Sequence, residues 1–187
     1  MKVPILILAV LTFSLNLIAQ SKSNDAIANQ LRQLQAAKSL TVAFDQPSNT
    51  SKIMGIADNF ASGEADDVGI QAMNFAIGFY YPGDSLTRSP DPILLTFWVL
   101  SKKPRFTVDH DLTIFGDQEI MTLGTARYVS KPRMDMEYLN FEISRENLTK
   151  IAGRTTVKFR LGDAEFSFTR SQLKLLADIL IVSEINP

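Results

Sequence analysis

The sequence predicts an α+β domain, in which a mostly antiparallel sheet of about five to seven strands carries helices at its face or ends. Two observations favour this class. The middle of the chain contains runs of alternating apolar residues that are separated by short turn sequences, whereas helical periodicity is confined to a segment near the N-terminus and two near the C-terminus. Strands and helices do not alternate regularly, so a parallel sheet is not expected.

The first nineteen residues have the features of a secretory signal peptide. Lys2 gives a positive start, residues 3–18 are mostly apolar, and Ala19 supplies a small residue at the expected cleavage position. An uncleaved membrane anchor is the alternative, although the run is short and interrupted for a spanning helix. We therefore expect an exported bacterial protein, periplasmic or extracellular, with residues 20–187 as one domain and no transmembrane segment in the mature chain.

Composition narrows the classes of partner. The chain has 19 basic and 20 acidic residues, a net charge of −1, and no cysteine. A near-neutral balance gives no long-range attraction for nucleic acid, so no nucleic acid partner is expected. Without cysteine there are no disulfides, thiolate nucleophiles or cysteine-ligated zinc sites, so stability must come from packing, and no cofactor is expected.

The N-terminal part of the domain predicts one helix followed by a loop. Residues 24–39 carry an apolar stripe at helical spacing, with Ile27, Leu31 and Leu34 on one side. Residues 45–67 are rich in Pro, Ser, Asn, Gly and Asp, which predicts a long loop with at most a short strand around residues 53–56.

Strand patterns begin after that loop. In residues 69–83 the odd positions from Met73 to Tyr81 are apolar, which predicts that a strand buries them. Residues 92–104 are apolar on both faces, which is typical of a central strand that is covered on both sides. Further strands are expected over residues 106–115, 119–129 and 136–143, with a hairpin turn at FGDQ between the first two.

The last fifty residues combine helix caps with a hairpin. Ser144 is a candidate N-cap for a short helix near 145–152, and Gly162 marks the turn of a hairpin between Val157 and Phe168. Thr169 and Gln172 have the spacing of a capping box, which predicts that a closing helix follows.

This C-terminal segment also carries a resemblance. The order ISRENLTKIAGRTTVKFRLGDAEFSFTRSQLKLLADIL is similar to the ending of uncharacterised exported bacterial proteins, in which a strand, a short helix, a hairpin and a closing helix recur. The resemblance implies export and the α+β class. It carries no activity to this chain, because those proteins have none that can be assigned to residues.

The letters GDSL at residues 83–86 match the name of a family of serine esterases and lipases. By that resemblance Ser85 is the nucleophile, which needs a base such as His110, the single histidine. Two prolines, Pro90 and Pro92, oppose the helix that should follow, and His110 lies in mid-chain instead of near the end. The Pro82-Gly83 pair instead predicts a type II turn, so we treat the match as chance.

Two further groups of residues are candidate sites. Asp109 and Asp111 would share a face of a strand and could chelate a hard cation, although a solvated turn is the simpler interpretation. Tyr80, Tyr81 and Trp98 are candidate binding residues, although aromatic residues in strands are commonly part of the core.

Taken together, these patterns predict a non-catalytic exported binding module or envelope-associated interaction module. Its partner would be a protein, a glycan or a small ligand. The alternatives are a divergent GDSL-like serine esterase that uses Ser85 and His110, and a weak cation-dependent binding module that uses Asp109 and Asp111.

Overall fold

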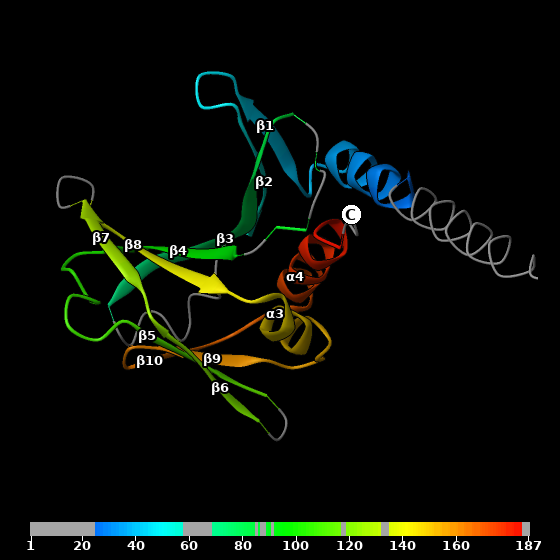
Figure 1. Ribbon diagram of the computed structural model, residues 1–187. Helices are drawn as coiled ribbons and strands as arrows, with labels where there is room; N and C mark the ends of the chain where they lie inside the picture. The colour runs from blue at the N-terminus through cyan, green and yellow to red at the C-terminus, as the bar shows by residue number, and fades with distance from the viewer. Residues whose placement is uncertain are drawn as a thin grey trace, which may run out of the picture.

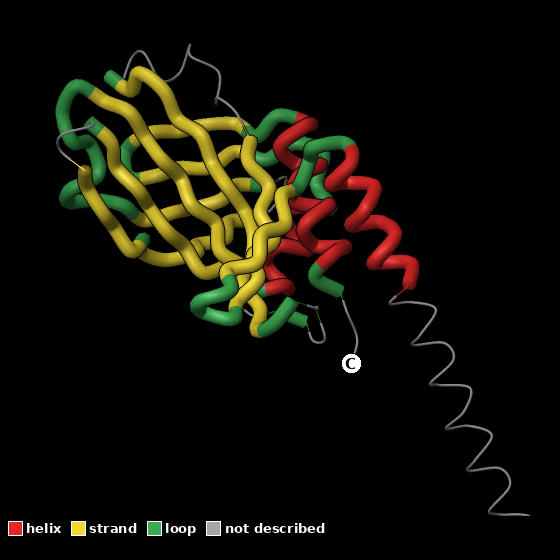
Figure 2. The backbone as a smooth tube through the Cα atoms, turned by 90° about the horizontal axis from the view of Figure 1, so that it is seen from above, coloured by secondary structure: helices red, strands yellow, loops and turns green. Residues whose placement is uncertain are grey.

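A computed structural model describes most of the domain. The ranges described are residues 25–57, 69–84, 86, 89–90, 92–116, 119–131 and 135–184. Two antiparallel sheets lie face to face and the helices gather at one end of them (Figures 1 and 2). The predicted α+β class is confirmed, whereas the expected signal peptide at residues 1–19 lies outside the described residues.

The larger sheet has six strands in the order β1-β2-β3-β4-β8-β7. Its strand β4 pairs with β3 and β8 along its length, which confirms the predicted central position. The expectation that both faces of this strand are covered is wrong, because the smaller sheet lies against one face only. The strands are β1 (Thr41–Asp45), β2 (Thr50–Ala57), β3 (Ile70–Pro82), β4 (Ile93–Ser101), β7 (Arg127–Lys131) and β8 (Met136–Ile143).

The loop predicted over residues 45–67 is wrong for residues 50–57, whereas the short strand considered around residues 53–56 is present as part of the longer strand β2. Residues 46–49 form a tight turn, and β2 follows it as a full strand that pairs with both β1 and β3. Asn49 adopts a left-handed conformation with φ of 49°, which asparagine tolerates, so the polar residues 46–49 form the turn of a hairpin. Residues 58–67 lie outside the described residues.

The smaller sheet has four strands in the order β10-β9-β5-β6, which are β5 (Asp111–Phe115), β6 (Ile120–Thr125), β9 (Lys158–Leu161) and β10 (Ala164–Ser167). The single strand predicted over residues 119–129 is wrong. Gly124, at a φ of 90°, sits at an irregularity in the pairing of β5 with β6, and the chain then crosses to β7 in the larger sheet. The strand predicted from Phe106 starts only at Asp111.

Helices occupy residues 25–36, α3 (Arg145–Ala152) and α4 (Arg170–Val182). The predicted caps are confirmed: Ser144 accepts from the backbone N–H of Asn147, and Thr169 and Gln172 form the reciprocal capping box. Within the described ranges, no helix combines the length and apolar character needed to span a bilayer.

The core lies between the two sheets and is rich in phenylalanine. Ring centroids of Phe97 on β4 and Phe159 on β9 are 5.3 Å apart, and those of Phe75 on β3 and Phe168 are 5.5 Å apart. The odd positions from Met73 to Tyr81 on β3 are buried here, as the alternation predicted. These contacts join the sheets and leave the opposite face of the larger sheet outside the core.

Candidate functional site

One face of the larger sheet points away from the smaller sheet, and Figure 2 shows that no described helix or loop crosses it. We call this the outer face. Register places the following residues on it: Lys52, Met54 and Ile56; Ala72, Asn74, Ala76, Gly78 and Tyr80; Leu94, Thr96, Trp98 and Leu100; Met136, Tyr138, Asn140 and Glu142; Arg127, Val129 and Lys131.

An aromatic pair lies at the centre of this face. Trp98, the single tryptophan of the chain, is the cross-strand partner of Tyr138, which in turn is opposite Val129 on β7. The Lys131 ammonium lies 5.0 Å from the centre of the Tyr138 ring. Tryptophan, tyrosine and methionine are enriched at protein interfaces, so the outer face has the composition of a contact surface.

The outer face is hollowed beside Gly78. In Figure 1 β1 and β2 rise steeply from the part of the sheet that β4 and β8 form. A Cβ at Gly78 would lie 2.2 Å from the Ile53 carbonyl oxygen, so glycine permits the close approach of β2. The resulting notch of about 100 Å³ is lined by residues that include Met54, Tyr80 and Leu94, with Lys52 also present.

The size of this notch limits what it can hold. Pockets for whole small molecules usually exceed about 300 Å³. A notch of about 100 Å³ instead suits one apolar side chain or a short piece of a larger partner.

The structure separates the three aromatic residues that the sequence indicated. Tyr80 and Trp98 both lie on the outer face. Tyr81 faces the other way and is buried, with its ring 6.3 Å from that of Phe79. Because successive residues of a strand point to opposite faces, Tyr80 and Tyr81 cannot serve one binding surface together.

His110 occupies a structural position at the edge of the core. Its Nδ1 lies 3.1 Å from the Phe106 carbonyl oxygen, which can only accept, so this nitrogen carries the proton. The imidazole stacks on Tyr128 at 5.6 Å. The neighbouring Asp109 carboxylate accepts a hydrogen bond from the Asp111 amide, and the Asp111 carboxylate accepts one from the Thr125 hydroxyl. Ser85 lies outside the described residues.

The two aspartates line an open polar depression with Asp163 and Glu165, and Arg160 lies among them. Asp163 is already paired, since its carboxylate accepts from the Arg105 guanidinium at 2.8 Å. In the part of the chain that the structure describes, no cluster of three or more histidine, cysteine, aspartate or glutamate side chains is placed to hold a metal ion.

Glu137 is the one buried carboxylate in the interior of the larger sheet that sequence reasoning missed. It is 1% exposed, and its oxygens accept from the backbone amides of Arg105 at 2.8 Å and Phe106 at 2.9 Å. They also accept from the Tyr128 hydroxyl at 3.0 Å. The signal was present: Glu137 is in phase with the buried residues Leu139 and Phe141.

This arrangement raises the pKa of the neighbouring Tyr128 phenol. Burial raises the pKa of Tyr128 above its ordinary value of 10.0, and the adjacent Glu137 carboxylate raises it further, against an opposite effect of the Ser130 side chain. The effect belongs to the network that fixes residues 101–106 on the sheet, because Glu137 holds two amides of that segment in place.

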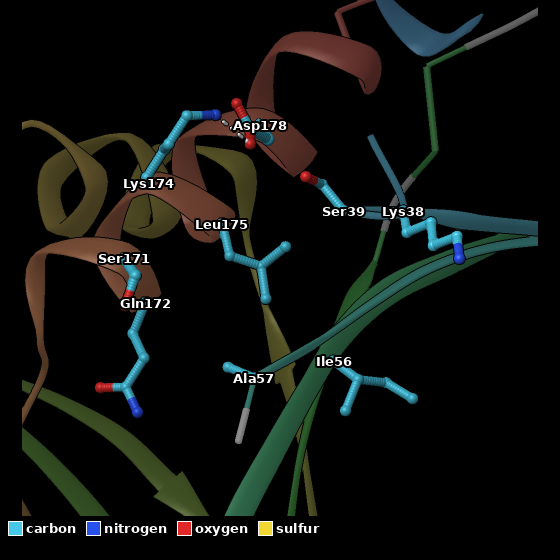
Figure 3. A pocket seen from close by; sticks show the side chains of 9 residues that line it. All are labelled: Lys38, Ser39, Ile56, Ala57, Ser171, Gln172, Lys174, Leu175 and Asp178. Carbon is cyan, nitrogen blue, oxygen red and sulfur yellow. Dashed lines mark hydrogen bonds and ion pairs between the residues drawn. The ribbon is translucent and has the colours of Figure 1, made fainter. Parts of the chain in front are cut away.

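A larger cavity, of about 400 Å³, lies between residues 38–39, the end of β2 and α4. Figure 3 shows Lys174 and Asp178 along one side of it, joined to each other, with Leu175 pointing toward Ile56 and Ala57. The Lys174 Nζ lies 2.6 Å from the buried Asp178 carboxylate. The carboxylate is therefore satisfied within the protein.

Comparison with known proteins returned no relative. No protein-family model matches the chain, and neither a curated protein nor a solved structure is similar enough to match it. Functional inference therefore depends on the geometry of the chain itself, and the similarity to exported bacterial proteins stays a prediction.

Proposed function

We propose that the protein is a non-catalytic exported binding module, acting in the periplasm or outside the cell, and that the outer face is its contact surface. The observation that carries this proposal is the Trp98–Tyr138 pair on a sheet face that the described protein leaves uncovered. The pair is half-buried, and Ile56, Tyr80 and Val129 are exposed on the same face. Large apolar side chains gathered on an uncovered face are typical of an interaction site.

A protein is the partner class that fits the outer face best. The aromatic pair offers rigid contact area near the centre, while the notch beside Tyr80 and Leu94 has room for a single apolar anchor. Polar groups surround these features, including Lys52 and Asn140, so a central apolar contact would have a polar rim.

Photo-crosslinking tests this surface in the cells from which the sequence comes. A photoreactive phenylalanine would replace Val129, which is 43% exposed on the outer face. The matched control replaces Ile120, which is 69% exposed on β6 of the smaller sheet. We expect one adduct of defined mass from position 129 and none of that mass from position 120.

A second substitution in the same chain shows whether the adduct depends on the outer face. Trp98→Ala should abolish the adduct at position 129 while leaving the far-ultraviolet circular dichroism unchanged. An adduct that survives Trp98→Ala, or one that forms equally at position 120, would refute the assignment of the outer face.

The non-catalytic part of the proposal has its own test. A fluorophosphonate probe reacts with activated serines, and we expect it not to label the purified protein. Labelling that disappears in Ser85→Ala would favour the esterase alternative over the binding module.

A further inference from the structure

The strand β1 forms one edge of the larger sheet and is unusually exposed. Of its residues only Val42 is half-buried, and Phe44 is 48% exposed. It pairs with β2 through five uninterrupted residue pairs. Edge strands ordinarily carry charges, proline or a bulge that prevent pairing with another chain, and the sequence TVAFD has a single charge, Asp45 at its end, with no lysine, proline or bulge.

The opposite edge of the same sheet has such protection. The strand β7, with the sequence RYVSK, carries Arg127 and Lys131 at its ends, both exposed. A strand from another chain would have to approach these two charges. The two edges therefore differ in their openness to pairing, and β1 is the open one.

The sequence of β1 is complementary to itself. In an antiparallel pair centred on Ala43, Ala43 lies opposite Ala43 of a second copy, Val42 opposite Phe44, and Thr41 opposite Asp45. This register pairs all five residues. Shifting the centre by one residue would pair fewer of them, and centring on Phe44 would place Ala43 opposite Asp45.

Each pair in the centred register is favourable. Val42 and Phe44 of the two copies would form an apolar cluster on one side of the joined strands, burying the exposed Phe44 ring. On the other side the Thr41 hydroxyl can donate to the Asp45 carboxylate.

We propose that β1 pairs with β1 of a second copy, so that two larger sheets join edge to edge in a symmetric dimer. This proposal does not depend on the proposed function, because the outer-face pair Trp98–Tyr138 lies on β4 and β8, which β2 and β3 separate from β1. A five-residue strand pair is a small interface, so the dimer is weak and forms at micromolar or higher concentration.

The absence of cysteine from the chain permits a direct test by single-cysteine substitution. In the centred register the two Ala43 positions are directly opposite, at a Cα separation of about 5 Å that suits a disulfide. The two Thr41 positions would be about 13 Å apart, too far for one. We expect A43C to give a covalent dimer under mild oxidation and T41C to remain monomeric.

Two further variants complete the experiment. S130C on β7 tests the protected edge and should not cross-link, and F44K should weaken the concentration-dependent dimer at least tenfold in sedimentation velocity. Circular dichroism verifies that each variant is folded, which is expected because Ala43 and Phe44 are exposed.

Two outcomes of the cross-linking would contradict the dimer. Folded A43C that stays monomeric after oxidation at millimolar concentration would overturn the proposal, and so would equal cross-linking of A43C and T41C. The outcome is independent of the photo-crosslinking at position 129, so failure of the dimer and failure of the binding surface can be told apart.

Discussion

The two faces of β4 illustrate how one strand divides between stability and contact. Phe97 points inward, is fully buried, and has ring neighbours on β3, β8 and β9. The next residue, Trp98, points outward, is half-buried, and has Asn74 and Tyr138 as cross-strand partners. Trp98, the larger of the two residues, therefore lies outside the core. Side-chain size and apolarity alone therefore do not identify the core residues of this domain.

Substituting Phe97 and Trp98 in turn should give the largest difference in unfolding free energy between the two faces of β4. Phe97→Ala removes a ring from the centre of the core and should lower the free energy of unfolding by about 3–5 kcal/mol. Trp98→Ala should lower it by less than about 1.5 kcal/mol, because Trp98 faces outward. Urea unfolding followed by far-ultraviolet circular dichroism measures both, and equal losses would show that something covers the outer face.

Two glutamates on β8 provide the next comparison. Glu137→Ala leaves the buried amide of Phe106 and the partly buried amide of Arg105 without their acceptor, which should cost about 2–4 kcal/mol of unfolding free energy. Glu142→Ala, at an exposed position of the outer face, should change it by about 0.5 kcal/mol or less. A loss at Glu137 no larger than that at Glu142 would contradict the role we give to the buried carboxylate.

Gly78→Ala tests the close approach of β2 to Gly78. The added methyl group would meet the Ile53 carbonyl oxygen, so we expect a loss of about 1–3 kcal/mol in unfolding free energy. Gly153→Ala is the control, since its Cβ would lie 3.3 Å from the nearest oxygen and its φ is −77°. Equal midpoints for Gly78→Ala and the parent protein in thermal melting would argue against this close approach.

The smallest expected effect is a dependence on alkaline pH. The pKa of Tyr128 is raised in the folded protein, so folding favours the protonated phenol. Its contribution to stability is complete below pH 10 and is lost as the pH rises through the folded pKa. The pKa of Lys150 is also raised, by Glu146, so part of the loss above pH 10.5 is not from Tyr128.

Tyr128→Phe separates the two contributions. As the pH rises above about 10, we expect the unfolding free energy of the parent protein to fall more steeply than that of the variant. Identical slopes would indicate that the raised pKa of Tyr128 has no part in stability.

Much of the fold could be predicted from local patterns. The caps at Ser144 and Thr169 and the alternation in β3 each depend on neighbouring residues, and the structure confirms them. The β1–β2 hairpin was not predicted because its polar turn dominates the composition of residues 45–57. The crossing from β6 to β7 was not predicted because the sheet that a strand joins is decided by partner strands distant in the sequence.

The outer face was only partly visible in the sequence. Alternation predicts that Tyr80 and Tyr81 face opposite ways, but it does not say which face is covered. That depends on the smaller sheet, whose strands follow later in the chain. Glu137 was recognisable by its phase, whereas its partners at residues 105–106 became apparent only with the tertiary structure.

Quenching of Trp98 fluorescence by acrylamide tests most directly whether the outer face is open. Because Trp98 is the single tryptophan, its signal needs no separation from others. In the folded full-length protein at low micromolar concentration, we predict a quenching constant within about threefold of that in urea, as for an indole that is partly exposed to solvent. A folded protein whose Trp98 is quenched tenfold less than in urea would have a covered outer face, and the account of that face as a contact surface would be wrong.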